Sequence, residues 1–108
     1  MKVLLDHNVP HRLRLDLAPL DVSTTHYMGW NNLDNGDLMA AAAQADFRVL
    51  ITADRGVGFQ QGLAAYSIGL VFLHIHPFTY PAIRPFAAAI TEAAGYAAKG
   101  QQLSVFRA

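Results

Sequence analysis

Two apolar segments of this sequence each lead into an aspartate. Residues 3–5 are followed directly by Asp6, and residues 49–51 are followed three positions later by Asp54. If the two segments are neighbouring strands, about 4.8 Å apart, carboxylates at that separation repel by roughly 3 kcal/mol at an effective dielectric near 20. A divalent cation such as Mg²⁺ or Mn²⁺ relieves this repulsion, because it takes carboxylate oxygens as ligands. The pattern therefore predicts a metal site.

Asp37 is the natural third ligand, since it falls in the first turn of a helix expected between the two strands. Asn8, two residues after Asp6, is expected to support the site by adding a carbonyl oxygen or by orienting a water. A metal held in this way activates water and neutralises the charge that develops on a phosphodiester. The predicted chemistry is therefore hydrolysis of a nucleic-acid backbone.

Helix capping is the alternative explanation for these acids and amides. Asn and Asp are favoured N-caps, so Asn8, Asp34 and Asp54 could each satisfy helix N–H groups. Asp37, three residues after Asp34, has the spacing of an acidic capping box. Helix capping does not explain why aspartates follow two separate strands and also stand on the helix between them. The metal-site interpretation and the capping interpretation therefore both stay open.

Strand and helix patterns alternate along the chain, and their order decides where these acids lie. We expect strands over residues 2–5, 21–27, 48–52, 68–75 and 103–106, helices over 9–17, 38–45 and 81–98, and loops over 28–33 and 56–66, the latter with a short helix as an alternative. This order predicts an α/β fold, a three-layer α/β/α sandwich with a mostly parallel sheet. In such sheets ligands bind outside the carboxyl ends of the strands, where Asp6 and Asp54 are expected.

Composition narrows the classes of function. The 108 residues predict a single domain, 1–108, with no internal linker. A formal net charge of zero argues against indiscriminate nucleic-acid binding, and the absence of cysteine excludes disulfides and thiolate zinc sites. No apolar run reaches the roughly 20 residues of a membrane span and no signal segment opens the chain, so we expect a cytoplasmic protein.

The order and spacing of three motifs resemble those of short PIN-like proteins, whose chains begin LLDxNxP and later read VLxTxD. The matching stretches are LLDHNVP from Leu4, GW and NGDL around residues 29–38, and VLITAD ending at Asp54. These proteins are similar to the PIN ribonuclease toxins of the VapC type. The resemblance implies a PIN-like fold, an Mg²⁺ or Mn²⁺ site formed by Asp6, Asp37 and Asp54, endoribonuclease activity, and a small antitoxin as partner. Many relatives carry further acids where this chain has Asn35 and Gly56, and Asn35 is expected to support the site.

Several other side chains are candidates for contact with RNA. His7 follows Asp6 and could donate to a phosphate, whereas an exposed turn residue is the alternative. Arg12, Arg14 and Arg55 carry guanidinium groups that suit phosphate, although a solvated helix face explains the first two equally well. Trp30 could stack on a base, or it could be buried against Leu33 or Met39.

A non-catalytic function is the rival hypothesis. His74 and His76 alternate along a strand as metal ligands can, but no neighbouring carboxylate or thiol completes a zinc set. Only 15% of the residues are charged and 53% are hydrophobic, against a usual charged share of about 25%. The apolar segment 83–106 is therefore expected to face a protein partner or a second copy in a homodimer. A PIN-like module that lost an acid and now serves in binding fits the same sequence.

Overall fold

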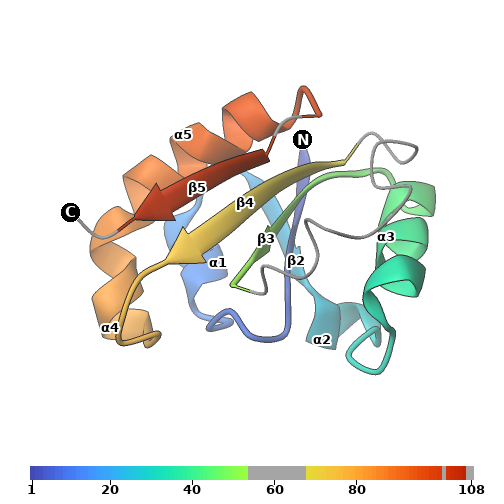
Figure 1. The fold of residues 1–108 in the computed structure, drawn as a ribbon, viewed down its shortest axis with the longest axis horizontal. Helices are drawn as coiled ribbons and strands as arrows, with labels where there is room; N and C mark the ends of the chain where they lie inside the picture. The colour runs from blue at the N-terminus through green and yellow to red at the C-terminus, as the bar shows by residue number, and fades with distance from the viewer. Residues whose placement is uncertain (54–67, 101, 107–108) are drawn as a thin grey trace.

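The computed structural model describes residues 1–53, 68–100 and 102–106. Strands and helices alternate through these residues (Figure 1). In chain order the elements are β1 (Lys2–Leu5), α1 (Leu13–Asp16), β2 (Asp21–Thr24), α2 (Thr25–Met28), α3 (Asn35–Gln44), β3 (Phe47–Thr52), β4 (Gly69–His74), α4 (Tyr80–Ile83), the 3₁₀ helix η3 (Arg84–Phe86), α5 (Ala87–Ala97) and β5 (Gln102–Phe106).

The strands of this part of the chain form one parallel sheet in the order β2-β1-β3-β4-β5. The central strand β1 lies between β2 and β3, with Leu5 in register with Thr24 on one side and Ile51 on the other. All strands point the same way, so their carboxyl ends meet at one edge (Figure 1). The condition set in the sequence analysis, that the strand before Asp6 and the strand before Asp54 are neighbours, is met.

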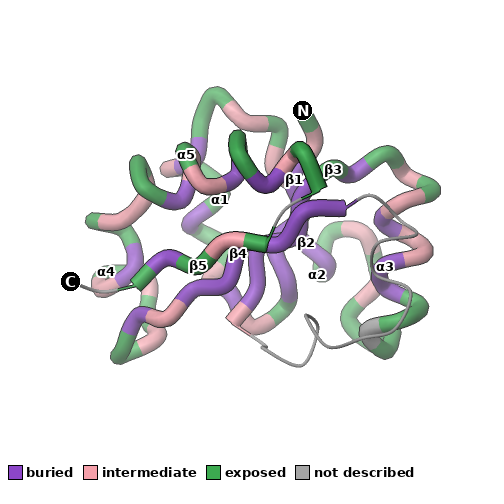
Figure 2. Tube along the Cα trace, turned by 45° about the horizontal axis from the view of Figure 1, so that its top comes forward, coloured by how far each residue is buried: buried purple, intermediate pink, exposed green. Residues whose placement is uncertain are grey.

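Alternating side chains along the strands build a core on each face of the sheet. On one face, Val3 and Leu5 pack with residues of α1, α4 and α5. On the other face, Leu4 and Leu50 pack with Leu38 and other residues of α3. Buried residues accordingly concentrate along the central strands (Figure 2). The sheet is covered on both sides, which confirms the predicted three-layer α/β/α sandwich.

Three predicted elements differ from the observed ones. The second strand ends at Thr24 rather than at residue 27, because the Thr24 hydroxyl accepts the Tyr27 N–H at 3.0 Å and caps the turn α2. The first helix is shorter than the predicted 9–17, since the chain passes through turns before α1 begins at Leu13. The predicted helix 81–98 is divided into α4, η3 and α5, because Pro85 lacks the N–H that a continuous helix needs.

A search of the described helices for one long and apolar enough to cross a bilayer finds none.

Candidate functional site

Asp6 lies at the carboxyl edge of the sheet, between the ends of β1 and β3. Its N–H donates to the Ile51 carbonyl at 2.9 Å, which extends the pairing of the two strands by one residue. The residue is 2% exposed. Burial of a carboxylate is costly unless hydrogen bonds compensate the lost hydration, so the partners of Asp6 determine what this side chain can do.

Among the described residues, three groups contact the Asp6 carboxylate as donors. Oδ2 accepts the Thr52 hydroxyl at 2.8 Å, from the neighbouring strand β3. Oδ1 accepts the backbone N–H of His7 at 2.8 Å and lies 3.0 Å from His7 Nδ1. A carboxylate offers about four lone-pair positions, so these contacts occupy most of them and fix the orientation of the group.

The His7 ring is the one of these contacts that can be exchanged without moving the backbone. Its side chain is 61% exposed, whereas Thr52 is fully buried. Rotation of the ring toward solvent would uncover Oδ1 and leave the other two donors in place. A cation that replaces the imidazole at Oδ1 would approach Asp6 from the His7 side.

Asn8 joins the loop after β1 to the end of β3. Its Oδ1 accepts the Ala53 N–H at 3.3 Å. The capping interpretation of Asn8 is wrong, because α1 begins only at Leu13 and the amide binds another strand end instead. This contact fixes the two strand ends relative to each other. The predicted support of a metal site by Asn8, through its carbonyl oxygen or an oriented water, stays a prediction.

Asp37 lies in the first turn of α3, which begins at the same edge of the sheet as the end of β1 (Figure 1). The residue is exposed. Its N–H donates to Asp34 Oδ1 at 2.7 Å, which confirms Asp34 as the N-cap of α3. The predicted supporting residue Asn35 is the first residue of this helix. The predicted ligand Asp54 and the predicted phosphate contact Arg55 lie outside the described residues.

The described residues contain no group of three or more His, Asp or Glu side chains placed to hold a metal ion. Asp6 and Asp37 supply oxygen ligands of the kind that Mg²⁺ and Mn²⁺ prefer. The predicted set of three depends on Asp54, and it therefore stays a prediction from the sequence.

Arg12 and Trp30, both expected near RNA, make contacts within the protein. The guanidinium of Arg12 lies 4.6 Å from the centre of the Tyr80 ring, a cation–π contact between the start of α1 and α4. Trp30 is half-buried against the α3 core and meets the Phe47 ring edge-to-face at 6.0 Å. The packing interpretation of Trp30 is confirmed, with Phe47 as an additional neighbour, and contacts of either residue with RNA stay predictions.

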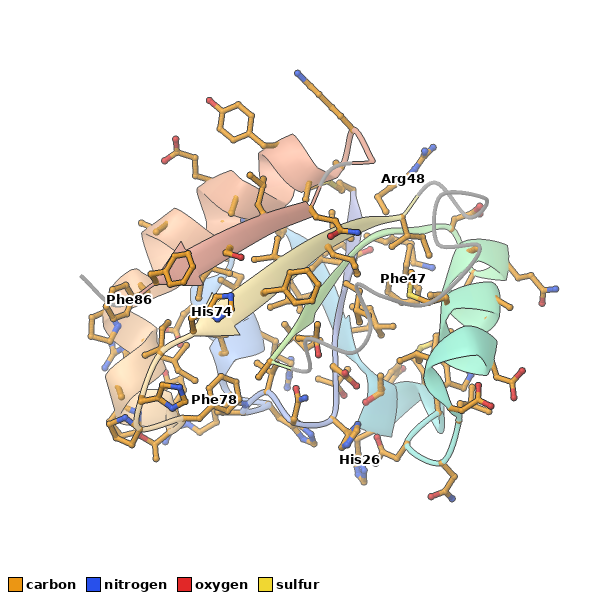
Figure 3. The ribbon with its side chains drawn as sticks, viewed as in Figure 1. His26, Phe47, Arg48, His74, Phe78 and Phe86 are labelled. Atoms are coloured by element: carbon orange, nitrogen blue, oxygen red, sulfur yellow. The ribbon has the colours of Figure 1, made fainter. Side chains whose placement is uncertain are left out.

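His74 also packs within the sheet. Its ring stacks on Phe106 of β5 at 4.4 Å between centroids, and its Nε2 lies 3.1 Å from Ser104 Oγ (Figure 3). His76 follows on the exposed segment after β4. The ring stacking gives His74 a role in joining the two strands.

Thr52 and a histidine pair were not singled out as functional residues from the sequence. The available signal for Thr52 was its position: it is a hydroxyl residue at the end of the strand that lies next to Asp6. His11 and His26 stack at 5.4 Å between ring centroids, although 15 positions separate them in the chain. Spacing along the sequence gives no signal for that pair, because the contact depends on how α1 and β2 pack.

Comparison with known proteins adds no relative. No protein-family model matches the chain, and neither the curated proteins nor the solved structures contain a significant match. The resemblance to PIN-like proteins rests on the quoted motifs alone.

Proposed function

We propose that this protein is a metal-dependent endoribonuclease of PIN-like type, with Asp6, Asp37 and Asp54 as ligands of Mg²⁺ or Mn²⁺. The observation that supports this most is the position of Asp6. Its carboxylate lies between the ends of two adjacent central strands, and one of its contacts with the described residues is to an exposed imidazole, that of His7. Asp37 is exposed at the same edge of the sheet.

Each residue of the site has a defined part in this proposal. Thr52 and the His7 N–H orient the Asp6 carboxylate, and Asn8 keeps the ends of β1 and β3 together. Such orientation matters because metal ligands bind well only when their geometry is fixed in advance. The metal, when bound, supplies an activated water and charge neutralisation for phosphodiester hydrolysis.

Titration of Mn²⁺ into the purified protein, followed by thermal unfolding, tests the metal site without a substrate. At a free Mn²⁺ concentration 100 times the dissociation constant, the free energy of unfolding should rise by about 2.7 kcal/mol. Asp6→Asn and Asp54→Asn should each abolish the rise, and both should abolish the cleavage of structured RNA. Asp37→Asn is a further variant. Because Asp37 is exposed, this substitution should leave the protein folded.

Asp21→Asn is the matched control, because Asp21 is exposed at the start of β2, the opposite edge of the sheet. This variant should keep the full response to Mn²⁺. Each variant is compared with itself in the absence of metal, so a loss of intrinsic stability does not affect the readout. An unchanged melting temperature of the wild-type protein at millimolar Mn²⁺ would contradict the proposal.

A non-catalytic PIN-like binding module is the second candidate function. A groove of about 360 Å³ lies between α5 and β5, and two large exposed side chains, Tyr96 (54% exposed) and Phe106 (64% exposed), line it. Under this alternative Mn²⁺ has no effect, and the groove binds a protein. The partners that we propose are a small antitoxin or a second copy of the chain, in the cytoplasm, and sedimentation of the purified protein tests the homodimer.

A further inference from the structure

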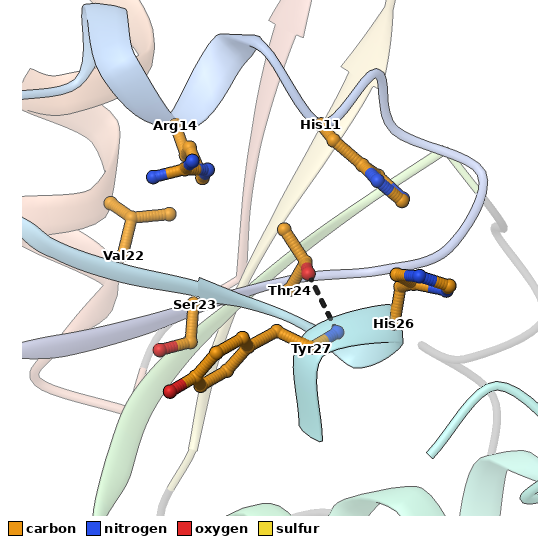
Figure 4. A pocket seen from close by; sticks show the side chains of 7 residues that line it. All are labelled: His11, Arg14, Val22, Ser23, Thr24, His26 and Tyr27. Atoms are coloured by element: carbon orange, nitrogen blue, oxygen red, sulfur yellow. Dashed lines mark hydrogen bonds between the residues drawn. The ribbon is translucent and has the colours of Figure 1, made fainter. Parts of the chain in front are cut away.

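A pocket of about 480 Å³ lies beside the edge strand β2, away from the Asp6 carboxylate. Its walls come from α1 and the turn before it, from β2 and from α2 (Figure 4). The lining residues are His11, Arg14, Val22, Ser23, Thr24, His26 and Tyr27. Because β2 ends the described sheet, the pocket is open along the outer side of a strand.

The lining of this pocket favours an anion. It contains one guanidinium, two imidazoles and three hydroxyl groups, and no carboxylate. The whole chain carries no net charge, so this local excess of positive and donor groups is a property of the pocket. Arg14 is exposed, and its planar guanidinium can form paired hydrogen bonds with phosphate oxygens.

His26 is arranged as a hydrogen-bond donor by its neighbours. The Asn31 Oδ1 accepts the Thr25 hydroxyl at 2.9 Å, so the other end of this amide, Nδ2, faces His26 Nδ1 at 3.2 Å. With Nδ1 accepting from the amide, the neutral ring of His26 carries its proton on Nε2. His11 stacks on this ring, and in Figure 4 the two imidazoles lie next to each other.

Tyr27 provides an aromatic surface at the same pocket. Its side chain is 81% exposed, a high fraction for a large aromatic residue. The ring lies beside Ser23 (Figure 4). Exposed aromatic rings next to arginines are the elements that bind single-stranded nucleic acids, because bases stack on the ring while the cation meets the backbone.

The pocket also adjoins the proposed nuclease site. Thr24, which lines it, is in register with Leu5, the residue before Asp6. The strand that lines the pocket is therefore the direct neighbour of the strand that leads to Asp6, at a spacing of about 4.8 Å between their backbones. A strand of RNA that crosses the carboxyl edge of the sheet can contact both.

We propose that this pocket binds a nucleotide of single-stranded RNA, with its phosphate at Arg14 and the two imidazoles and its base on Tyr27. The choice of RNA as ligand rests on the proposed function. A free nucleotide shares the same chemistry, and an acidic peptide laid along β2 is a different ligand class that the experiment separates.

Fluorescence anisotropy of a short labelled oligoribonucleotide, in low salt with EDTA, tests the proposal. Arg14→Ala and Tyr27→Ala should each weaken binding about tenfold, because the first removes a phosphate contact and the second removes a ring on which a base stacks. Arg14→Ala should also lower the salt dependence by about 0.7 in the log–log slope. Arg48→Ala is the matched control, because Arg48 is exposed near the start of β3, toward the opposite edge. It should change binding less than twofold.

Three results would overturn the proposal: no binding by the wild-type protein, equal losses in Arg14→Ala and Arg48→Ala, or competition by an acidic peptide or by adenosine monophosphate that matches unlabelled RNA. Thermal unfolding checks that the variants are folded, which is expected because both substituted side chains are exposed. Since EDTA removes metal, binding is measured independently of cleavage. Failure of the Mn²⁺ titration and failure of RNA binding are therefore distinguishable.

Discussion

The hydrogen bond from Thr52 to Asp6 gives the sharpest test of how the candidate site is held. Replacement of Thr52 by Val keeps the shape of the side chain and removes the hydroxyl that donates to Oδ2 at 2.8 Å. Both residues are buried, at 0% and 2% exposure, so water does not replace the lost donor. A buried hydrogen bond to a charged group contributes about 1.5–3 kcal/mol, and we expect a loss of about 2 kcal/mol.

This loss is large enough to measure in a thermal scan. For a domain of this length the entropy of unfolding is about 0.23 kcal/mol/K, so Thr52→Val should lower the melting temperature by about 9 °C. Circular dichroism or calorimetry in EDTA gives the value without a contribution from metal. The response to Mn²⁺ should also weaken in this variant, because Asp6 loses the donor that orients it.

Thr91→Val is the matched control. Its hydroxyl donates at 2.9 Å to the Ala87 carbonyl, within the helix α5. That hydroxyl supplements the helical backbone and satisfies no buried charge, so its removal should cost less than about 0.5 kcal/mol. If Thr52→Val destabilises the protein no more than Thr91→Val, the Asp6 carboxylate is not held by this bond and the account of the site is wrong.

Two further predictions concern the fold around the site. Gly69→Ala should destabilise the protein by at least about 3 kcal/mol in a denaturant titration, because the added Cβ would overlap the carbonyl oxygen of Ala97. Gly95→Ala is its control: a Cβ there meets nothing within 4 Å, so this substitution should be neutral or stabilising in the same titration. The phenol of Tyr80 has a pKa raised above 10.0, first because it donates to Asp16 at 2.6 Å and then through desolvation and the charge of that carboxylate. Asp16→Asn should lower this pKa in an ultraviolet titration. Because the folded state keeps the proton longer, the stability due to this contact is lost as the pH rises through the raised pKa.

The layered architecture could be predicted from the sequence, because apolar strands alternate with helix patterns. Leu4 and Leu5 lie on opposite faces of one strand, and a sheet covered by helices on both sides buries both of them. The exact ends of the strands and helices could not be predicted. Thr24 has the composition of a strand residue, and only its bond to the Tyr27 N–H shows that it ends β2 as a cap. Pro85 lies inside the third helix pattern, and its missing N–H divides the helix although the apolar period continues across it.

The candidate site was predicted in part. The position of Asp6 at the carboxyl edge of the sheet follows from the rule that parallel strands share this edge, whereas the pairing of β1 with β3 comes from the structure. The burial of Asp6 could not be predicted, because it depends on the Thr52 hydroxyl and on His7, whose contacts are made across 46 positions and in a tight turn respectively. The contact between His11 and His26 could not be predicted for the same reason, because packing between segments distant in the sequence brings the two rings together.

The order of the strands explains why the chemical groups gather where they do. Three adjacent strands, β2, β1 and β3, end at one edge, and each delivers a different group: the donor-lined pocket at β2, the Asp6 carboxylate at β1, and the Thr52 hydroxyl at β3. Neighbouring strands at this edge are about 4.8 Å apart. The hydroxyl faces the carboxylate and orients it, whereas the pocket lies on the other side and has no carboxylate in its lining. Under the proposed function, a strand of RNA held at β2 would present its backbone to Asp6, which is the arrangement that hydrolysis of a phosphodiester would need.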